Sequence, residues 1–489
     1  MIKLHFSLKS AKKILSTGAA LFLLSIGTSQ CFAQSESGTA NGKAAQERQF
    51  LEIINTLYYY IEQNYVEDVD PQKLYEGALR GMLESLGDPY STYMDSSEWR
   101  SLTDITVGNF GGVGLSISKP SMNNTDKPAY VQVVQPIDGT PGAKAGILAG
   151  DLITEINGID TSTITMDEVL GMLRGKEGES VTVKIRRGKA TEFECTLVRA
   201  IIENPTIKYD MIGKTGYIRI SDFSSNTAKR FQEALDSFEN RKYTSLIIDL
   251  RDNGGGLLSS AVDIADKFID SGVIVSTKSR IAYENQVYTA SPRKTKVKGI
   301  PVIVLVNGNS ASASEILAGA LKDTKSAYLV GTKTFGKGSV QIPRSLVNND
   351  GFKITVARYY SPSDSNIDKV GIPPDREISY PQFTEEEEQA FVDLMNSEEV
   401  ADYVEQHPNM TEDDISFYAE QLRETYPLES RTLRKIIRNE TDRTKPSRLY
   451  DLDYDLQLNE ALYILEHEDF KALMSTTKTL KDLEQENAQ

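Results

Sequence analysis

Histidine and cysteine are scarce in this chain of 489 residues. There are three histidines, His5, His407 and His467, so the middle of the chain has none. A Ser-His-Asp peptidase uses histidine as its general base, and zinc sites depend on histidine or cysteine ligands. The sequence therefore argues against both kinds of site.

The two cysteines are Cys31 and Cys195. Cys31 lies in an N-terminal segment with the features of an export signal, which leaves one thiol and no internal disulfide. The fold must then be held together by packing. Cys195 follows Glu192 and Glu194 in an alternating stretch that predicts a strand, and we expect a buried, unreactive thiol.

Basic residues are in the minority, with 54 Lys and Arg against 70 Asp and Glu, which gives a formal net charge of −16. A negative surface repels the phosphates of nucleic acid instead of binding them. The charge is typical of a well-solvated protein, and it disfavours a nucleic-acid partner.

Long apolar runs are missing except at the N-terminus. Residues 1–13 contain four lysines, and residues 14–26 form an apolar run. Small residues at Cys31 and Ala33 fit a signal-peptidase site, so residues 1–33 are predicted to be a secretory signal cleaved after Ala33. A lipid-modified cysteine and an uncleaved membrane anchor are the open alternatives. The signal predicts export, to the periplasm if the source is a bacterium.

The length predicts three or more folded units, and the sequence pattern changes along the chain. Apolar residues at helical spacing mark residues 44–103, and short strands between Gly-rich turns mark 104–200. Apolar strands alternate with helices over 205–382, which predicts an α/β core with a largely buried sheet. Residues 383–489 are acidic and helical. The predicted fold class is therefore multidomain α+β: an α/β core, an inserted β-rich domain, and helical N- and C-terminal regions.

One apolar stripe in the C-terminal region needs a partner surface. Its residues recur at helical spacing and are Leu458, Ala461, Leu462 and Leu465. We expect this stripe to pack on the chain's own core, and another subunit is the alternative.

The first candidate site lies within residues 307–315, where an apolar strand gives way to a helix. A nucleophile at Ser312 would be held on rigid elements, and the helix N-terminus would stabilise developing negative charge. Ser312-x-x-Glu315 is also a capping box. The segment alone leaves a nucleophile and a helix cap both open.

The second candidate site lies within residues 331–341 and contains Phe-Gly-Lys-Gly around Lys337. It resembles a phosphate-binding P-loop, but Gly338 stands where Ser or Thr should bind magnesium, and a strand-like stretch follows instead of a helix. Lys337, Ser339 and Gln341 are predicted to share one face of that strand. Partial burial would lower the lysine pKa from ~10.4 toward neutrality, as a general base requires. A solvated surface lysine is the alternative.

The third candidate site is the run of three glycines, Gly254 to Gly256, between a strand and a helix. Its backbone N–H groups suit an oxyanion hole or an anion-binding loop. A tight turn is the alternative.

Two of these motifs together are specific. Ser-Ala-Ser-Ala-Ser-Glu at 310–315 and Thr-Phe-Gly-Lys-Gly-Ser-Val-Gln at 334–341 resemble the C-terminal processing peptidases, also called tail-specific proteases. The resemblance extends over about residues 50–380. It implies a serine endopeptidase with Ser312 as nucleophile, Lys337 as base and Gln341 as the residue that orients the lysine.

The resemblance also implies an acyl-enzyme mechanism without metal or cofactor. The oxyanion donors would be the backbone amides of Ala313 and Gly255. The chain departs from the family at Gly254, where many relatives have proline, and a looser loop is expected there.

Residues 104–200 look like the family's PDZ domain. Gly112, Val113, Gly114 and Leu115 would then receive the carboxylate of a substrate's C-terminal tail, and the next strand would pair with that tail. Arg174 matches an arginine that some relatives use to couple tail binding to activity; a solvated arginine is the alternative. The implied partners are proteins or peptides with accessible C-terminal tails.

The ends of the resemblance are weaker. Residues 87–94 are similar to the segment that precedes the PDZ domain in the family, and residues 455–458 resemble relatives that form homodimers through terminal helices. Residues 385–445 match no known segment. The predicted domains are thus a signal peptide (1–33), an N-terminal helical region (44–103), a PDZ domain (104–200), a Ser/Lys peptidase core (205–382) and a C-terminal helical region (383–489).

Two other function classes stand as alternatives. A non-enzymatic adaptor would bind tails through the PDZ domain and carry an inert core, and the intact Ser, Lys and Gln set argues against it. A P-loop NTPase is disfavoured by Gly338 and by the strand pattern that follows it.

Overall fold

The computed structural model describes residues 40–120, 129–188, 191–443, 445 and 448–487. The predicted signal, 1–33, lies outside the described residues. The chain divides into two compact units between Gly81 and Met82. In the described part of the chain, no helix is both long enough and apolar enough to cross a membrane.

The described residues of the first unit form two helices, as their spacing of apolar residues predicts. They are α2 (Ala40–Asn64) and α3 (Pro71–Glu84), the second of which runs past the end of the unit. The Tyr58 hydroxyl donates to the Pro71 carbonyl at 3.2 Å. The apolar residues of α2 stay exposed, with Phe50 at 54% and Leu57 at 55%. No residue of α3 is fully buried, and Leu74, Leu79 and Leu83 are partly buried.

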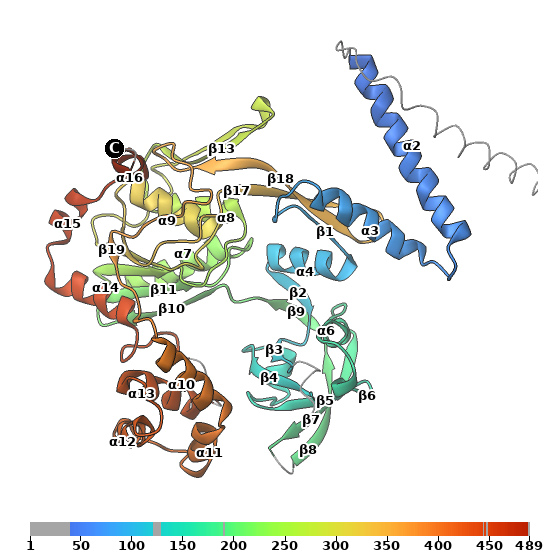
Figure 1. Cartoon of the computed structure of the whole chain (residues 1–489). Coiled ribbons are helices and arrows are strands. Elements are labelled where there is room, and N and C mark those ends of the chain that lie inside the picture. Colours follow the sequence, from blue (N-terminus) through green and yellow to red (C-terminus); the bar gives the residue numbers. More distant parts are fainter. Residues whose placement is uncertain (1–39, 121–128, 189–190, 444, 446–447, 488–489) are drawn as a thin grey trace, which may run out of the picture. The chain divides into compact units, whose positions relative to one another are not determined.

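The second unit is built on a six-stranded sheet in the order β10-β11-β12-β15-β16-β19. The strands from β11 to β19 are parallel, and β10 joins β11 as an antiparallel edge (Figure 1). Their bounds are Ile207–Ile212, Thr215–Ile220, Ser245–Asp249, Val302–Val306, Tyr328–Gly331 and Arg376–Glu377.

Alternate side chains of these strands enter two separate apolar clusters. Ile218, Ile248 and Val304 pack with helices α7 (Thr227–Asn240), α8 (Leu258–Ala265) and α9 (Ala313–Asp323) on one face. Ile247 and Leu305 pack on the other face with Leu458, Ala461 and Ile464 of α14 (Leu456–His467). Side chains alternate with period two along a strand, so this sheet is buried on both faces. The predicted α/β core and the predicted docking of the C-terminal stripe are both confirmed.

A second sheet of the core recruits a strand from before the inserted domain. Its order is β1-β18-β13-β14, and β17 pairs with β18. β1 (Thr92–Met94) pairs with β18 so that Thr92 lies opposite Lys353. Residues 92–94 therefore belong to the core sheet, although the sequence assigns them to the N-terminal helical region. The remaining bounds are β13 (Val273–Ser279), β14 (Gln286–Thr289), β17 (Ser339–Ser345), β18 (Gly351–Tyr360), α4 (Ser96–Val107) and the 3₁₀ turn Ala282–Glu284.

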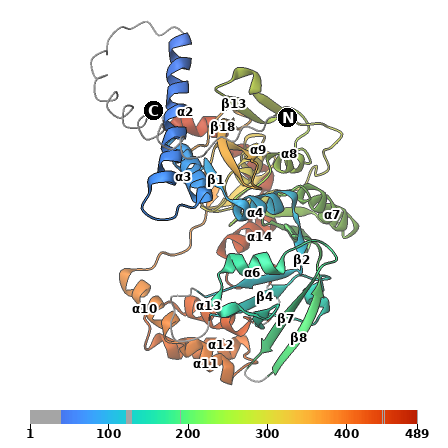
Figure 2. The same ribbon diagram turned by 90° about the vertical axis from the view of Figure 1, so that its right-hand side faces the viewer.

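The β-rich domain is an insertion with its own apolar core. Its first strand β2 (Asn109–Gly112) pairs with its last strand β9 (Ala200–Glu203). Between them lies a sheet in the order β3-β4-β5-β7-β8, with β6 beside β5. Figure 2 shows β7 and β8 side by side in this sheet. The elements are β3 (Leu115–Ser118), β4 (Val131–Pro136), α5 (Pro141–Lys144), β5 (Leu152–Ile156), β6 (Ile159–Asp160), the 3₁₀ turn Thr161–Thr163, α6 (Met166–Leu173), β7 (Ser180–Arg187) and β8 (Thr191–Val198).

Cys195 lies on β8, as predicted, but it is only partly buried. Burial raises the pKa of its thiol, and the nearby carboxylate of Asp151 adds to the rise. The thiol is therefore less reactive at neutral pH than a free cysteine.

Four helices in the C-terminal region form an apolar cluster of their own, centred on Leu394, Ala419 and Leu433. They are α10 (Glu385–Asn396), α11 (Glu399–Gln406), α12 (Glu412–Arg423) and α13 (Ser430–Thr441). The chain then returns to the core sheet through α14, followed by α15 (Phe470–Thr476) and α16 (Leu480–Asn487). The helical C-terminal region of the prediction thus contains a separate bundle and a sheet-covering helix.

Candidate active site

The candidate residues meet in one crevice of about 810 Å³. Ser312, Lys337 and Gln341 line it together with Gly254 and Gly256 of the glycine loop. The nucleophile and the base predicted from separate motifs therefore lie in the same hollow of the second unit.

Ser312 occupies the turn between β15 and α9 in a conformation that non-glycine residues rarely adopt. Its φ is 56° and its ψ is −113°. Such angles cost energy and persist where the surroundings enforce them. The Gly255 backbone packs against the Ser312 side chain so closely that a Cβ on Gly255 would lie 2.7 Å from the Ser312 Cβ. The glycine loop and the serine turn are thus fitted to each other.

Glu315 connects the serine turn to the lysine loop. Its carboxylate accepts from the backbone N–H of Ser312 at 2.9 Å and of Lys337 at 2.8 Å. It also accepts from the Gly336 N–H at 2.7 Å and the Thr334 hydroxyl at 2.6 Å. Burial raises the pKa of Glu315, and these four donors oppose the rise. The cap read from the sequence is present, and it holds the lysine loop as well as the helix.

Tyr359 makes a second bridge between the same two residues. Its hydroxyl lies within hydrogen-bonding distance of the carbonyls of Ser312 and Lys337. Because Glu315 holds their N–H groups, the backbones of Ser312 and Lys337 are tied together on both sides. Tyr359 is 3% exposed, so water does not compete for these contacts.

The surroundings of the Lys337 amine lower its pKa. Burial lowers its pKa, and the positive charge of Lys353 lowers it further, while Asp88 and Glu315 act in the opposite direction. The amine nitrogen lies 4.9 Å from the centre of the Tyr90 ring. This lysine is partly buried rather than solvated, as the catalytic interpretation requires.

One expectation about the lysine side is corrected, namely the position of Lys337 on a strand. β17 begins at Ser339, so Lys337 precedes the strand instead of lying on it. Among the described contacts, no hydrogen bond joins the Lys337 amine to the Ser312 hydroxyl or to Gln341. The Gln341 amide instead donates to the Ser339 hydroxyl at 2.8 Å and the Thr355 hydroxyl at 3.1 Å. Catalytic hydrogen bonds are often long until substrate binds.

A strand, and not a helix, follows the lysine loop. A phosphate-binding loop needs a helix in that position, because the helix N-terminus receives the phosphates. The structure therefore rejects the P-loop interpretation, as the sequence pattern indicates.

The two backbone amides predicted to be oxyanion donors differ in their hydrogen bonding. Ala313 is the first residue of α9, and its N–H has no partner among the described contacts. The Gly255 N–H donates to the Asn253 side-chain oxygen at 2.9 Å, so it is occupied in this conformation. No described hydrogen bond uses the amides of Gly254 or Gly256. The expected Gly255 donor is therefore not free here, because the neighbouring asparagine holds it.

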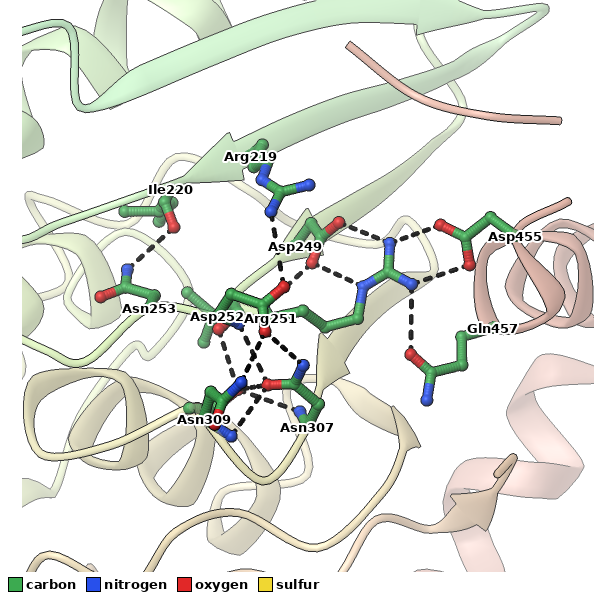
Figure 3. Close-up of polar contacts among 12 residues, drawn as sticks. Arg219, Ile220, Asp249, Arg251, Asp252, Asn253, Asn307, Asn309, Asp455 and Gln457 are labelled. Atoms are coloured by element: carbon green, nitrogen blue, oxygen red, sulfur yellow. Dashed lines mark hydrogen bonds and ion pairs between the residues drawn. The ribbon is translucent and has the colours of Figure 1, made fainter. Parts of the chain in front are cut away.

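Polar contacts of the residues just before the three glycines hold the glycine loop in place (Figure 3). Arg251 lies between the carboxylates of Asp249 and Asp455, with which it forms ion pairs of 2.6 and 2.7 Å. Asp252 accepts from the side-chain amides of Asn307 and Asn309, at 2.9 Å each, and so joins the glycine loop to the turn before Ser312. Sequence reasoning did not single out these residues.

The buried Asn253 completes this support. Its side-chain nitrogen donates to the Ile220 carbonyl at 2.8 Å, and its own carbonyl accepts from the Ala311 N–H at 3.0 Å. An asparagine after a buried strand is the one local feature that could have indicated such a role.

The inserted domain presents the predicted tail-binding loop at the start of an edge strand. Gly112 and Val113 are buried, Gly114 has φ 73°, and Leu115 begins β3. Among the described residues, β3 is the last strand of its sheet, and no described strand pairs with its outer edge, where an extended peptide would add.

Arg174 is not solvated. Its guanidinium pairs with Asp104 of α4 at 2.9 Å and stacks over the Phe110 ring at 5.2 Å. Burial raises the pKa of Asp104, and Arg174 opposes the rise. Arg174 thus connects the inserted domain to helix α4. This contact is one through which the predicted coupling by Arg174 would act.

Three family descriptions match successive parts of the chain. Residues 15–98 match the N-terminal domain of the activating protease CtpB, 132–187 match the PDZ domain, and 214–378 match peptidase family S41. The order agrees with the architecture described above.

Similar proteins carry consistent names. A carboxy-terminal-processing protease of Bartonella bacilliformis is 38% identical over 376 residues, which are 76% of this chain and 83% of that protein. The carboxy-terminal processing protease CtpA of Bacillus subtilis is 32% identical over 75% of each chain. Among solved structures, the photosystem II D1 C-terminal processing protease is 28% identical over 67% of this chain and 92% of that one, with a TM-score of 0.39.

Proposed function

The chain belongs to the carboxy-terminal processing proteases of peptidase family S41, and on that basis we propose that it cleaves peptide bonds with Ser312 as nucleophile and Lys337 as base. It is a serine-type peptidase with a PDZ domain. The observation that carries the proposal is the double connection between Ser312 and Lys337 through Glu315 and Tyr359, beside an amine whose pKa is lowered by burial.

The reaction begins with neutral Lys337. Its amine takes the proton of the Ser312 hydroxyl as the serine oxygen bonds to the scissile carbonyl carbon. The carbonyl oxygen becomes an oxyanion and accepts from the Ala313 amide. The Gly255 amide supplies the second hydrogen bond once its contact with Asn253 breaks.

Collapse of this intermediate breaks the C–N bond, and the protonated Lys337 gives its proton to the leaving amine. Ser312 then carries the acyl group as an ester. Water, deprotonated by the same lysine, attacks the ester carbon, and the bond to the Ser312 oxygen breaks. The new C-terminus is released, and Lys337 returns the proton to the serine oxygen. Gln341 orients the lysine during both steps.

Substrate selection is assigned to the inserted domain. Residues 112–115 bind the terminal carboxylate of a substrate tail on backbone N–H groups, and the tail pairs with β3. Arg174 couples this binding to the core. We further propose that the protein is exported to the periplasm after cleavage of residues 1–33 and forms a homodimer through its terminal helices. Gln34 is then the first residue of the exported protein, which N-terminal sequencing tests.

The test of the chemistry uses two variants and a quenched fluorescent, unstructured peptide with a free apolar C-terminus. Ser312→Ala and Lys337→Ala should abolish cleavage without changing the circular dichroism spectrum. Ser475→Ala and Lys471→Ala, on exposed positions of α15, are the matched controls and should cleave normally. A serine-reactive fluorophosphonate should label Ser312 of the wild type and not of Lys337→Ala. Normal cleavage by either active-site variant would contradict the assignment.

A further inference from the structure

Three strands bring residues from distant parts of the chain to the lysine side of the crevice. β18 lies between β1 and β17 over residues 351–353. Thr355 of β18 is opposite Gln341 of β17, next to a bulge between Val340 and Gln341. Asp88 lies just before β1. A bulge changes the direction of a side chain, and here it accompanies a contact from Gln341 to its partner strand.

Asp88 is an anchored carboxylate. It accepts from the Thr355 hydroxyl at 2.6 Å, from the Ser91 hydroxyl, and from the Tyr90 N–H at 3.1 Å. Burial opposes its ionisation, but these hydrogen bonds hold the pKa of Asp88 below its ordinary value. At neutral pH its oxygens therefore accept and do not donate.

The charge on Asp88 sets the direction of the next hydrogen bonds. The Thr355 hydroxyl donates its single proton to Asp88. The Thr355 oxygen must therefore accept in its contact with Gln341. The Gln341 amide nitrogen lies 3.1 Å from the Thr355 oxygen and 2.8 Å from the Ser339 oxygen. Its amide oxygen has no partner among the described contacts. The chain of donors thus runs from Gln341 through Thr355 to Asp88.

The orientation of this amide matters because Lys337 brings only N–H donors when it is protonated, and a neutral amine must direct its lone pair at the serine. The amide oxygen of Gln341 can accept from a Lys337 N–H, whereas the amide nitrogen is itself a donor and cannot accept from it. Gln341 and Lys337 line the same crevice. A flipped amide would turn the wrong group toward the base.

We propose that Asp88 and Thr355 are positioning residues, which fix Gln341 so that its amide oxygen faces Lys337 during catalysis. This inference rests on the proposed function, because it needs Lys337 to be the base. It assigns a role to the segment before the inserted domain, which lies far from the nucleophile in the sequence.

Asp88 also contributes charge. Three charged groups shift the pKa of the Lys337 amine, namely Asp88 before β1, Lys353 on β18 and Glu315 on α9, and the amine lies over the ring of Tyr90. Asp88 and Glu315 raise the lysine pKa, and Lys353 lowers it. A neutral substitution at Asp88 should therefore lower the lysine pKa.

The first experiment separates the Thr355 hydroxyl from its volume. Thr355→Val removes both hydrogen bonds, and we expect kcat to fall about tenfold with KM unchanged, a part of the roughly 10²- to 10⁴-fold that a general base supplies. Thr355→Ser restores the hydroxyl and should restore most of kcat. Thr191→Val, on an exposed position of β8, controls for the substitution itself.

The second experiment uses Asp88→Asn, which keeps an acceptor for Thr355 but removes the charge. The acid limb of its pH–kcat profile should move to lower pH, because the neutral lysine forms earlier. Thr355→Val keeps the charge on Asp88, so the acid limb of its pH–kcat profile should not move to lower pH. A role in packing alone would move neither limb.

The outcomes separate the two proposals. If wild type cleaves the peptide and Ser312→Ala does not, the proposed function stands. The positioning role is then overturned if Thr355→Val keeps kcat within about twofold, if Thr355→Ser fails to rescue it, or if the Asp88→Asn limb stays in place. If Ser312→Ala cleaves normally, the proposed function itself fails.

Discussion

Arg251 and Asp455 lie 204 residues apart in the chain and form an ion pair with two hydrogen bonds of 2.7 Å each (Figure 3). Arg251 lies just before the glycine loop, and the Asp455 carboxylate caps helix α14 by accepting from the Leu458 N–H. The pair therefore joins the C-terminal region to the loop that borders Ser312.

Loss of this pair should be costly. Asp455→Asn leaves the buried Arg251 with one anionic partner, and we expect the free energy of unfolding of the core to fall by about 2 kcal/mol, less than the roughly 3–5 kcal/mol of a wholly unpaired buried charge. Urea titration followed by tyrosine fluorescence measures it. Glu420→Gln, which breaks an ion pair with Arg423 exposed by 57% on both sides, should cost about 0–1 kcal/mol. Equal losses would show that the buried pair has no special role.

The same pair predicts a dependence on pH. Burial opposes ionisation of Asp455, but the Arg251 hydrogen bonds and charge bring its pKa below the ordinary value. An acid with a lowered folded pKa stabilises the fold above its unfolded pKa, ~3.9, and loses that contribution as the pH falls through the folded pKa. The difference in stability between wild type and Asp455→Asn should therefore be full at pH 6 and shrink below about pH 4. A constant difference would contradict this.

Glu315→Gln tests the connection between serine and lysine. An amide would turn an N–H₂ group toward two of the four donors that now meet the carboxylate, so we expect more than about tenfold loss of kcat and a stability loss of about 1–3 kcal/mol. Glu387 is a matched control, because it has the same capping position on the exposed start of α10. Glu387→Gln should leave activity unchanged, and similar effects of both substitutions would reduce Glu315 to a helix cap.

Two adjacent glycines should respond in opposite ways to alanine. A Cβ on Gly255 would lie 2.8 Å from the Ala311 carbonyl, at φ 112°, so Gly255→Ala should displace the serine turn and abolish cleavage. A Cβ on Gly254 meets nothing within 4 Å. Gly254→Ala should keep activity and raise stability by about 0.4–1 kcal/mol through the unfolded state. Thermal unfolding and peptide cleavage of both variants decide it.

Lys353 provides a test of the base by charge alone. Its positive charge lowers the Lys337 pKa, so Lys353→Met should raise that pKa and move the acid limb of the pH–kcat profile upward. The rate should fall at neutral pH and recover at alkaline pH. A rate that stays low throughout would mean that Lys353 acts on substrate and not on the base.

The local elements were predictable because short-range patterns decide them. The apolar strand before Ser312 and the helix after it are present as predicted, and the apolar strands around Ile247 and Val304 are buried as their composition indicates. The motifs around Ser312 and Lys337 led to one crevice because each lies at the end of a buried strand, where neighbouring strands bring their loops together.

The supporting contacts were not predictable from local pattern. Glu315 looks like an ordinary capping residue until the lysine loop folds onto it. Arg251 and Asp455, like Asp88 and Thr355, are paired only by the tertiary fold, and nothing in either segment alone identifies its partner. The exposed apolar face of α2 shows the same limit, since periodicity predicted the helix but not whether the described chain covers it.

The pairing of β1 with β18 has a practical consequence for anyone who designs a gene fragment of this enzyme. A fragment that starts at residue 205 would omit a strand, Trp99, whose ring lies against Gly351, and the carboxylate behind Gln341. Because β2 and β9 run side by side where the insertion leaves and rejoins, a short linker between them would remove the inserted PDZ domain and keep both parts of the peptidase core in one polypeptide.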